Sequence, residues 1–255
     1  FLLSKVADVL VKLKVKSGGY IPDIGLMNSP RNHKNKNDDD DDDDDRQSCF
    51  KICGRAFTVK MVFDNGDKTT KSSKETHYLD TVERDSIVVI SAPHNSKNAV
   101  WGGLMTARAK VLGLRGVIID GRCRDLRDHD ELDFPVFARG NSVLGQSTFT
   151  KPTETQEPLT IYPSFSNMSK SYQSQRVKDE RDDESDQNFE PVTINPNDII
   201  MADQDGVVRI PKDLIDQVLK LCKVADEVEK NCLRYILSGH TVTETFEKFR
   251  STKKN

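Results

Sequence analysis

One stretch of this chain, from Trp101 to Gly140, constrains the fold more than any other. It opens with Gly102-Gly103 before a segment with helical character and continues into the short apolar run Val117-Ile118-Ile119. A charged loop, a second helical segment and the strand-like FPVFARG follow. A short apolar run of this kind is typical of a strand buried on both faces. The alternation of helix and strand predicts an α/β fold.

The flanking segments supply the other elements of this fold. Apolar residues recur at helical spacing over residues 1–16, and residues 50–63 and 86–90 have strand character. Further elements are predicted as a short helix over 74–82, strands over 159–162 and 192–194, a hairpin over 199–211 and two amphipathic helices over 212–249 that break at Ser238-Gly239. Together they predict a single mixed α/β sandwich domain over residues 1–255.

Two polar segments interrupt this pattern. Residues 28–48 contain eight consecutive aspartates, Asp38 to Asp45, and residues 163–190 are rich in Ser, Asp, Glu, Lys and Gln. A run of like charges repels itself and buries no apolar surface, so we predict an acidic disordered insertion at 28–48. Residues 163–190 are predicted to be a polar low-complexity insertion. The alternative for the aspartates, loose calcium binding, lacks the spaced ligands and glycine turns of a built site.

Charge and cysteine content narrow the setting and the partners. The formal net charge is −3 and the Lys and Arg residues are scattered, which argues against nucleic-acid binding. No run of about 18 apolar residues occurs, so we expect no membrane span. Five cysteines without a framework spacing or a secretory signal predict reduced thiols in the cytoplasm, with half a metal site at Cys49 and Cys53 as the alternative. The first residue is Phe1 rather than Met, so we expect the natural start to lie upstream.

The residues with the most chemical potential follow the apolar run. In open α/β sheets ligands bind beyond the carboxyl ends of strands, which is where residues 121–125 fall. Asp125 precedes a helical segment and fits the N-cap position. Its alternative role is that of an oxygen ligand for Mg²⁺ or Mn²⁺. Arg122 and Arg124 are surface arginines or, if one points inward, a clamp for an oxyanion. The spacing alone favours the cap.

Gly102 and Gly103 precede a good helix start. Free backbone N–H groups at a helix N-terminus bind carboxylates and phosphates, and glycine lets such a ligand approach closely. A plain tight turn is the alternative. An anion-binding helix start, an arginine and an aspartate near one strand end favour a metal-assisted site for a small carboxylate. At the later hairpin turn, we interpret the carboxylates of Asp203 and Asp205 as structural rather than as metal ligands.

At this point the residues resemble a known family. The block GGLMTARAKVLGLRGVIIDGRCRDLRDHDELDFPVFARG is similar to the core of the RraA-like family, which includes the 4-hydroxy-4-methyl-2-oxoglutarate/4-carboxy-4-hydroxy-2-oxoadipate aldolases. The similarity extends to GRAFTV at 54–59 and INPNDIIMADQDGVV at 194–208, with a weaker echo around Asp8. The resemblance implies an α/β/α sandwich with a mixed sheet and C-terminal helices. It also implies a homotrimer or a dimer of trimers with sites at subunit interfaces.

The resemblance assigns chemistry to the central stretch. It implies a class II pyruvate aldolase that also decarboxylates oxaloacetate, acts on small 2-oxo or hydroxy acids and uses a divalent cation, Mg²⁺ or Mn²⁺. Asp125 matches the metal ligand of the family, and Arg124 matches the arginine that contacts the pyruvoyl oxygen. This reverses the order of the two roles for Asp125. The backbone that holds the substrate carboxylate matches Gly102, Gly103, Leu104 and Met105.

One position departs from the family pattern, and two rival functions remain. Bacterial aldolases of this family carry an acidic residue at the position of Gly103, where it orients the catalytic water. Glycine has no such group, so the resemblance favours decarboxylation over aldol cleavage. The main rival is a non-catalytic regulatory protein of the ribonuclease-binding type, with the acidic insertion as a contact tail. A methyltransferase, a second label of this family, lacks its G-x-G-x-x-G fingerprint here.

Overall fold

The computed structural model describes residues 2–29, 50–66, 76–163 and 190–250. Their main feature is a ten-stranded mixed sheet with the order β1-β12-β11-β3-β4-β6-β7-β2, to which β5 adds beside β6 and β8 beside β3. A separate pair joins β9 to β10. The strands are β1 (Tyr20–Ile21), β2 (Gly25–Leu26), β3 (Lys51–Phe63), β4 (Ser86–Ser91), β5 (Ala99–Trp101), β6 (Gly116–Cys123), β7 (Val136–Asn141), β8 (Thr150–Thr155), β9 (Leu159–Ile161), β10 (Val192–Ile194), β11 (Ile199–Asp203) and β12 (Gly206–Ile210).

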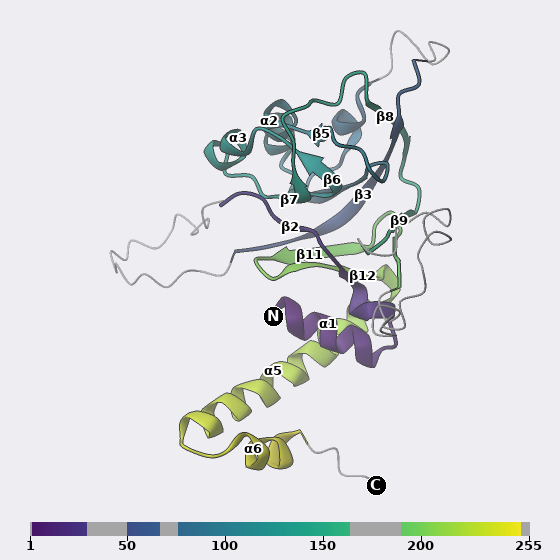
Figure 1. The fold of residues 1–255 in the computed structure, drawn as a ribbon. Coiled ribbons are helices and arrows are strands. Elements are labelled where there is room, and N and C mark those ends of the chain that lie inside the picture. The colour runs from purple at the N-terminus through teal and green to yellow at the C-terminus, as the bar shows by residue number, and fades with distance from the viewer. Residues whose placement is uncertain (1, 30–49, 67–75, 164–189, 251–255) are drawn as a thin grey trace, which may run out of the picture.

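The helices lie on two outer sides of the strands. Helices α2 and α3 cover the upper side in Figure 1, whereas α1 and α5 lie below β11 and β12. The helices are α1 (Leu3–Lys12), α2 (Gly103–Leu112), α3 (Leu126–Glu131), α5 (Ile215–Leu237) and α6 (Val242–Phe249), with short 3₁₀ helices at Lys16–Gly19, Tyr78–Thr81 and Lys212–Leu214. This arrangement is the α/β fold with a mixed sheet and C-terminal helices that the family resemblance implies, although strands as well as helices cover the second face of the central strands.

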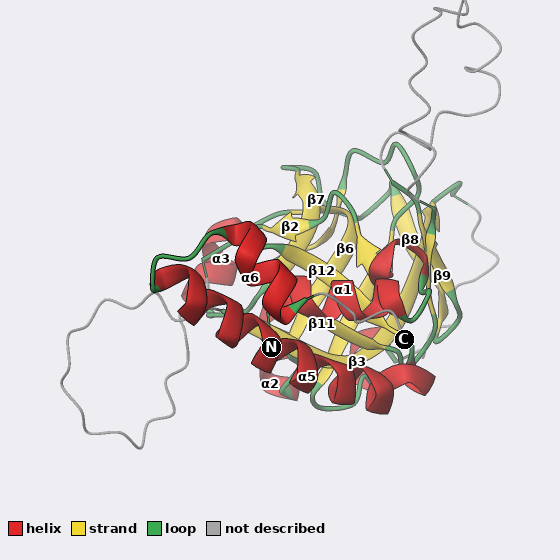
Figure 2. Ribbon diagram, turned by 90° about the horizontal axis from the view of Figure 1, so that it is seen from below, coloured by secondary structure: helices red, strands yellow, loops and turns green. Residues whose placement is uncertain are grey.

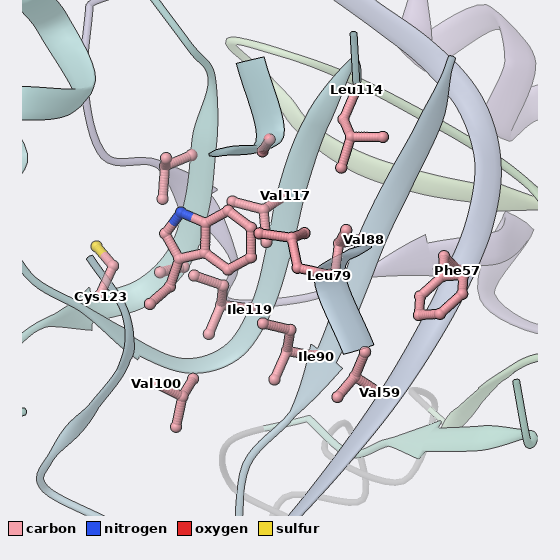
Figure 3. Close-up of a cluster of buried hydrophobic side chains, with 14 of the residues drawn as sticks. Phe57, Val59, Leu79, Val88, Ile90, Val100, Leu114, Val117, Ile119 and Cys123 are labelled. Atoms are coloured by element: carbon pink, nitrogen blue, oxygen red, sulfur yellow. The ribbon is translucent and has the colours of Figure 1, made fainter. Parts of the chain in front are cut away.

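The centre of the sheet is parallel. Strands β3, β4, β6 and β7 run side by side in the same direction, with Val88 opposite Val117 and Val117 opposite Val136. Parallel sheets are covered on both faces, and β4 is accordingly buried from Ser86 to Ile90. On the face toward α2 and α3, side chains from β3, β4 and β6 converge in one core (Figure 3). Each fully buried Ile or Val there stabilises the fold by about 1.5–3 kcal/mol.

The opposite face of these strands packs on other strands rather than on helices. Val89, Ile118 and Phe137 form a second core with β9, β10, β11 and β12. The outer face of β11 and β12 then meets α1 and α5 in a third core (Figure 2). The N-terminal helix buries Val6 and Leu10 in this core, as its spacing predicts. Strand alternation therefore sorts each residue of β4, β6 and β7 onto one of two different faces.

The C-terminal helices extend away from the strands. Helix α5 contacts α1, and α6 folds back onto α5 (Figure 1). A capping box starts α6, in which Thr241 Oγ1 accepts from the Glu244 N–H and the Glu244 carboxylate accepts from the Thr241 N–H. Reciprocal bonds of this kind satisfy two donors that a helix start otherwise leaves free. The two helices end and begin around Ser238-Gly239, as predicted.

Three sequence predictions need correction or lie outside the described residues. The short helix expected over 74–82 is a 3₁₀ turn at Tyr78–Thr81, and residues 67–75 are outside the described ranges. Asn28, where we began the acidic insertion, is buried: its Nδ2 donates to the Phe134 carbonyl and its Oδ1 accepts from the Val136 N–H. The rest of the two predicted insertions lies almost wholly in the undescribed residues 30–49 and 164–189.

Candidate functional site

The candidate site lies where the start of α2 meets the turn between β6 and α3. The N–H of Arg124 donates to the carbonyl of Trp101 at 3.0 Å, which ties the end of β6 to the residue before Gly102. The two segments that the sequence singled out are therefore in contact, although about twenty residues of helix and strand separate them. Gly102, Gly103, Leu104, Met105, Arg124 and Asp125 all lie at this junction.

Asp125 does not act as the cap of α3. It occupies the N-cap position with left-handed backbone angles, φ 61° and ψ 46°, but its side chain makes no bond to that helix. Its Oδ2 instead accepts from the Gly103 N–H at 3.0 Å, so it closes the N-terminus of α2. The backbone of Asp125 still serves α3, because its carbonyl accepts from the Asp128 N–H at 3.0 Å. The predicted N-cap position of Asp125 is therefore confirmed, but its side chain bonds to the start of α2 and not to α3.

Arg124 and Asp125 form an exposed ion pair. Arg124 Nε lies 3.3 Å from Asp125 Oδ2, and the side chains are 45% and 39% exposed. An exposed pair contributes little to stability, about 0–1 kcal/mol, so its contacts leave it available for a ligand. The Gly103 N–H and Arg124 Nε both contact Oδ2 of Asp125, and no described residue bonds to Oδ1. That oxygen is free to coordinate a cation or a water molecule.

The two glycines are required by this packing. A Cβ at Gly102 would come within 2.6 Å of Asp125 Oδ2, so any side chain there displaces the carboxylate. Beyond Gly103, the N–H groups of Leu104 and Met105 face no acceptor among the described residues. Helix α2 thus presents two free donors and the positive end of its dipole beside Arg124, which suits an anion.

Asp128 is a neighbour of the site that sequence reasoning missed. A Cβ at Gly103 would lie 2.0 Å from Asp128 Oδ2 and 2.8 Å from its Cγ. The carboxylate of Asp128 therefore fills the space that a side chain at position 103 would need. The only signal in the sequence was the glycine itself, because nothing in its spacing names the residue on α3 that packs against it.

A buried cluster of polar side chains links the elements that carry the site. Trp101 Nε1 donates to Thr106 Oγ1 at 2.8 Å, and Thr106 Oγ1 lies 2.9 Å from His129 Nδ1. His129 is fully buried, and its Nε2 lacks a hydrogen-bond partner among the described residues. Burial lowers the pKa of His129, against the opposite effect of the Arg124 backbone and the nearby carboxylates. The neutral imidazole joins β5, α2 and α3 beneath the ion pair.

The donor set suits a hard cation that keeps most of its water. Asp125 supplies one carboxylate oxygen, and within the described ranges no group of three or more His, Cys, Asp or Glu side chains is placed to hold a metal. Mg²⁺ and Mn²⁺ fit such a site, because Mg²⁺ is commonly held by one or two carboxylates with waters completing its shell. A zinc site needs three or four protein ligands, which these residues do not provide.

Other sequence candidates lie elsewhere. At the β11–β12 turn, Asp203 Oδ1 accepts from the Asp205 N–H at 2.9 Å, which confirms the structural interpretation of this turn. Cys53, Cys123, Cys222 and Cys232 are free thiols, and Cys49 lies outside the described residues. Over the part of the chain that the structure covers, no helix has both the length and the apolar composition to cross a membrane.

Comparison with known proteins places this chain in a family. Residues 31–209 match the RraA-like family, described as Aldolase/RraA, so the chain belongs to the RraA-like family. It is 27% identical over 199 residues to protein DlpA of Legionella pneumophila, covering 78% of this chain but only 28% of DlpA. It is also 28% identical over 137 residues to a putative 4-hydroxy-4-methyl-2-oxoglutarate aldolase of Halalkalibacterium halodurans, covering 54% of this chain and 51% of that protein.

Solved structures share the fold. An uncharacterized protein of Pseudomonas syringae pv. tomato superposes with a TM-score of 0.69 at 22% identity, covering 96% of this chain and 92% of that one. Streptomyces coelicolor RraAS2, described as an unusual member of the RNase ES inhibitor RraA protein family, gives 0.60 at 16% identity, with 93% and 91% covered. The family resemblance and the fold class expected from the sequence are therefore confirmed.

Proposed function

We propose that this chain is a divalent-metal-dependent lyase that forms pyruvate from small 2-oxo or hydroxy acids. The proposed reactions are oxaloacetate decarboxylation and cleavage of 4-hydroxy-4-methyl-2-oxoglutarate or 4-carboxy-4-hydroxy-2-oxoadipate. Family membership and the putative aldolases among its relatives support this class of reaction. The observation that carries the proposal is the junction at Asp125 Oδ2, which receives both the Gly103 N–H and the Arg124 guanidinium.

Asp125 is the residue that would hold Mg²⁺ or Mn²⁺. Its Oδ2 is held by the Gly103 N–H and by Arg124, and its Oδ1 has no hydrogen-bond partner among the described residues. Because these contacts already hold the Asp125 carboxylate in place, less conformational entropy is lost when it coordinates a cation. The bound cation would supply Lewis-acid stabilisation of negative charge on the 2-oxo group of the substrate.

Arg124 and the start of α2 bind and orient the substrate in this proposal. The free N–H groups of Leu104 and Met105 receive the substrate carboxylate at the positive end of the helix. The Arg124 guanidinium then lies beside the adjacent carbonyl oxygen, where negative charge develops when a carbon–carbon bond breaks. Gly102 and Gly103 add no side chain of their own to the helix start, where the carboxylates of Asp125 and Asp128 already pack.

The balance between the two reactions follows from position 103. Cleavage of an aldol needs a base for the substrate hydroxyl and a donor for the enolate, whereas decarboxylation needs only the donor. Position 103, which carries the acidic residue in the bacterial aldolases, is a glycine here and supplies no titratable group of its own. We therefore propose oxaloacetate decarboxylation as the faster activity.

We also propose that the site is completed in a homotrimer or a dimer of trimers. Three apolar side chains on the segments that meet near the ion pair are exposed: Leu104 at 89%, Val143 at 91% and Leu144 at 45%. Val143 and Leu144 precede Gly145, which packs against Arg124. Clustered apolar exposure of this kind marks interaction surfaces. A second subunit placed there would exclude water and add the ligands that one chain lacks.

The alternative function is a non-catalytic interaction protein. The small number of protein ligands favours it, because the described residues of one chain include no group of three or more His, Cys, Asp or Glu side chains placed to hold a metal ion. The two functions differ in one measurement, the release of pyruvate from oxaloacetate by purified protein. The lyase predicts release that EDTA abolishes and that Mg²⁺ or Mn²⁺ restores. Equal release with and without EDTA, at the rate of the metal-free buffer control, would reject the lyase and leave the interaction protein.

A further inference from the structure

A second cavity lies at the carboxyl ends of β4, β6 and β7, on the face turned away from α2 and α3. Its volume is about 330 Å³, within the usual range for small-molecule sites. The residues that matter for its chemistry are Ser91, His94, Lys97, Asp120, Arg122 and Arg139. The carboxyl ends of parallel strands are the usual place for ligands in open α/β sheets. Neither the family match nor the proposed lyase accounts for this cavity.

Strand alternation explains why polar groups gather here. Val89, Ile118 and Phe137 point into the second core from three adjacent strands. Two residues further along each strand, at the next position on the same face, are Ser91, Asp120 and Arg139. The apolar row is therefore followed by a polar row at the edge of the sheet. Asp120 also lies opposite Ser91 in the strand register.

The polar row forms a half-buried network. Arg139 Nε donates to Asp120 Oδ1 at 2.5 Å, and Arg139 Nη2 donates to the carbonyl of Tyr162 at 2.7 Å. The side chains of Asp120 and Arg139 are 17% and 19% exposed. Among the described residues, the one contact of Asp120 Oδ2 is the long hydrogen bond from Ser91 Oγ at 3.4 Å. This oxygen therefore keeps the capacity to accept a stronger hydrogen bond at the floor of the cavity.

The burial of Asp120 affects its ionisation. It raises the pKa of Asp120, although Arg139, Ser91 and His94 each act to lower it. The three partners do not fully replace the water that Asp120 has lost. An additional hydrogen-bond donor would therefore stabilise its carboxylate further. A ligand hydroxyl is such a donor, and it adds no charge to the site.

The mouth of the cavity is positively charged. Lys97 and Arg122 line it, and neither forms an ion pair with a carboxylate of the described residues. Arg122 Nη1 donates to the carbonyl of Asn141 at 2.9 Å, which fixes the guanidinium but leaves its charge uncompensated. His94 also lines the cavity and lies close enough to Asp120 to affect its pKa. Lys97 and Arg122 have no carboxylate partner among the described residues, whereas Arg139 compensates the charge of Asp120. The cavity therefore favours an anion.

From these observations we propose that the cavity is a second ligand site, which binds a small hydroxylated organic anion. The anionic group, a carboxylate or a phosphate, lies between Lys97 and Arg122, and a hydroxyl group donates to Asp120 Oδ2. The site is independent of Arg124 and Asp125, because β6 directs Asp120 and Arg122 to one face and packs Ile119 and Cys123 into the core of the other.

Calorimetric titration of the full chain, treated with EDTA, tests this site apart from the lyase. The probes are L-malate and glycerol 3-phosphate, with succinate as the matched dicarboxylate that lacks a hydroxyl and inorganic phosphate as the bare anion. We expect one of the first two to bind at least tenfold more tightly than its unhydroxylated counterpart. Which of them binds distinguishes a hydroxy acid from a phosphorylated polyol. Equal binding of each pair, or no binding by any probe at millimolar concentration, overturns the proposal.

Variants locate the site. Arg122→Gln and Lys97→Gln should each weaken binding about tenfold, because each removes a cation from the mouth. Arg124→Gln is the matched control on the other face and should leave binding unchanged. Loss of binding in Arg124→Gln but not in Arg122→Gln would assign the probe to the first site and overturn the proposal. Absence of pyruvate release, in contrast, would reject the lyase and leave this binding result intact.

Discussion

The two faces of the sheet at the end of β6 carry the same pair of residue types in opposite environments. On the α2 side, Arg124 and Asp125 are 45% and 39% exposed, and a backbone N–H rather than a second side chain fixes the carboxylate. On the β9 side, Asp120 and Arg139 are 17% and 19% exposed and pair with one another at 2.5 Å. The first pair is free to exchange its partners for a ligand. The second pair lines the cavity at the carboxyl ends of β4, β6 and β7.

The largest effect should come from the exposed pair and should fall on activity alone. Asp125→Ala removes the proposed metal ligand, and we expect kcat/KM for oxaloacetate to fall by roughly 10³-fold or more, as when a main electrostatic contribution is lost. The thermal midpoint should change little, because exposed ion pairs stabilise by about 0–1 kcal/mol. Steady-state kinetics and a thermal melt measure the two. Arg127→Gln, at an exposed i,i+4 pair with Glu131, is the control.

A change in the half-buried pair of Asp120 and Arg139 should lower stability rather than activity. Arg139→Met leaves Asp120 desolvated without its partner, and we expect a loss of about 3 kcal/mol in unfolding free energy. Urea denaturation measures it. The double variant Asp120→Asn with Arg139→Met should recover part of that loss, because it removes the unpaired charge as well. A stability unchanged in Arg139→Met would show that this pair does not differ from the exposed one.

A smaller effect is expected at the glycine that packs on Asp128. Gly103→Ala places a Cβ about where Asp128 Oδ2 now lies, so α2 or α3 must shift and kcat/KM should fall roughly 10-fold or more, in line with the cost of small displacements at reacting centres. The double variant Gly103→Ala with Asp128→Ala should regain much of the activity. Additive losses in this double-mutant cycle would show that the two residues do not interact. Gly25→Ala, where a Cβ meets no atom within 4 Å, is the control.

The smallest effect concerns the histidine beneath the exposed pair. Burial lowers the pKa of His129 below its ordinary value of 6.5, so the folded chain favours the neutral ring while the unfolded chain binds a proton below that pH. Its contribution to stability is present above pH 6.5 and is lost as the pH falls through the folded pKa. We expect the free energy of unfolding to decrease from pH 7 to pH 5. His129→Gln should flatten this slope in urea titrations, and an equal slope would contradict the account.

The sequence predicted the long elements and the short strands β9 and β10, but it missed four other strands. Helix α1, strand β3, the β11–β12 hairpin and helices α5 and α6 have enough residues for their periodicity to be read. Strands β1 and β2 have two residues each, and β5 has three, too few for any period. Strand β8 is polar and contains Pro152, which is a feature of edge strands and masks strand character.

The residues of the candidate site were predictable, but their contacts were not. Arg124, Asp125 and the glycine helix start were found from spacing and family resemblance, and the structure brings them together. The partner of Asp125 is a backbone N–H from another helix, and the partner of Gly103 is a side chain from α3. Such long-range packing leaves no local signal. The second cavity did leave one, since Ser91, Asp120 and Arg139 each follow a core residue by two positions.

Direct measurement of metal binding tests the central claim, that the exposed carboxylate rather than the buried one is the ligand. Mn²⁺ is titrated into wild type, Asp125→Asn and Asp120→Asn, and free Mn²⁺ is followed by electron paramagnetic resonance. The account predicts one bound Mn²⁺ per chain in wild type and in Asp120→Asn, with binding weakened at least 10-fold in Asp125→Asn, the loss typical of altered metal sites. Equal binding by wild type and Asp125→Asn would contradict it.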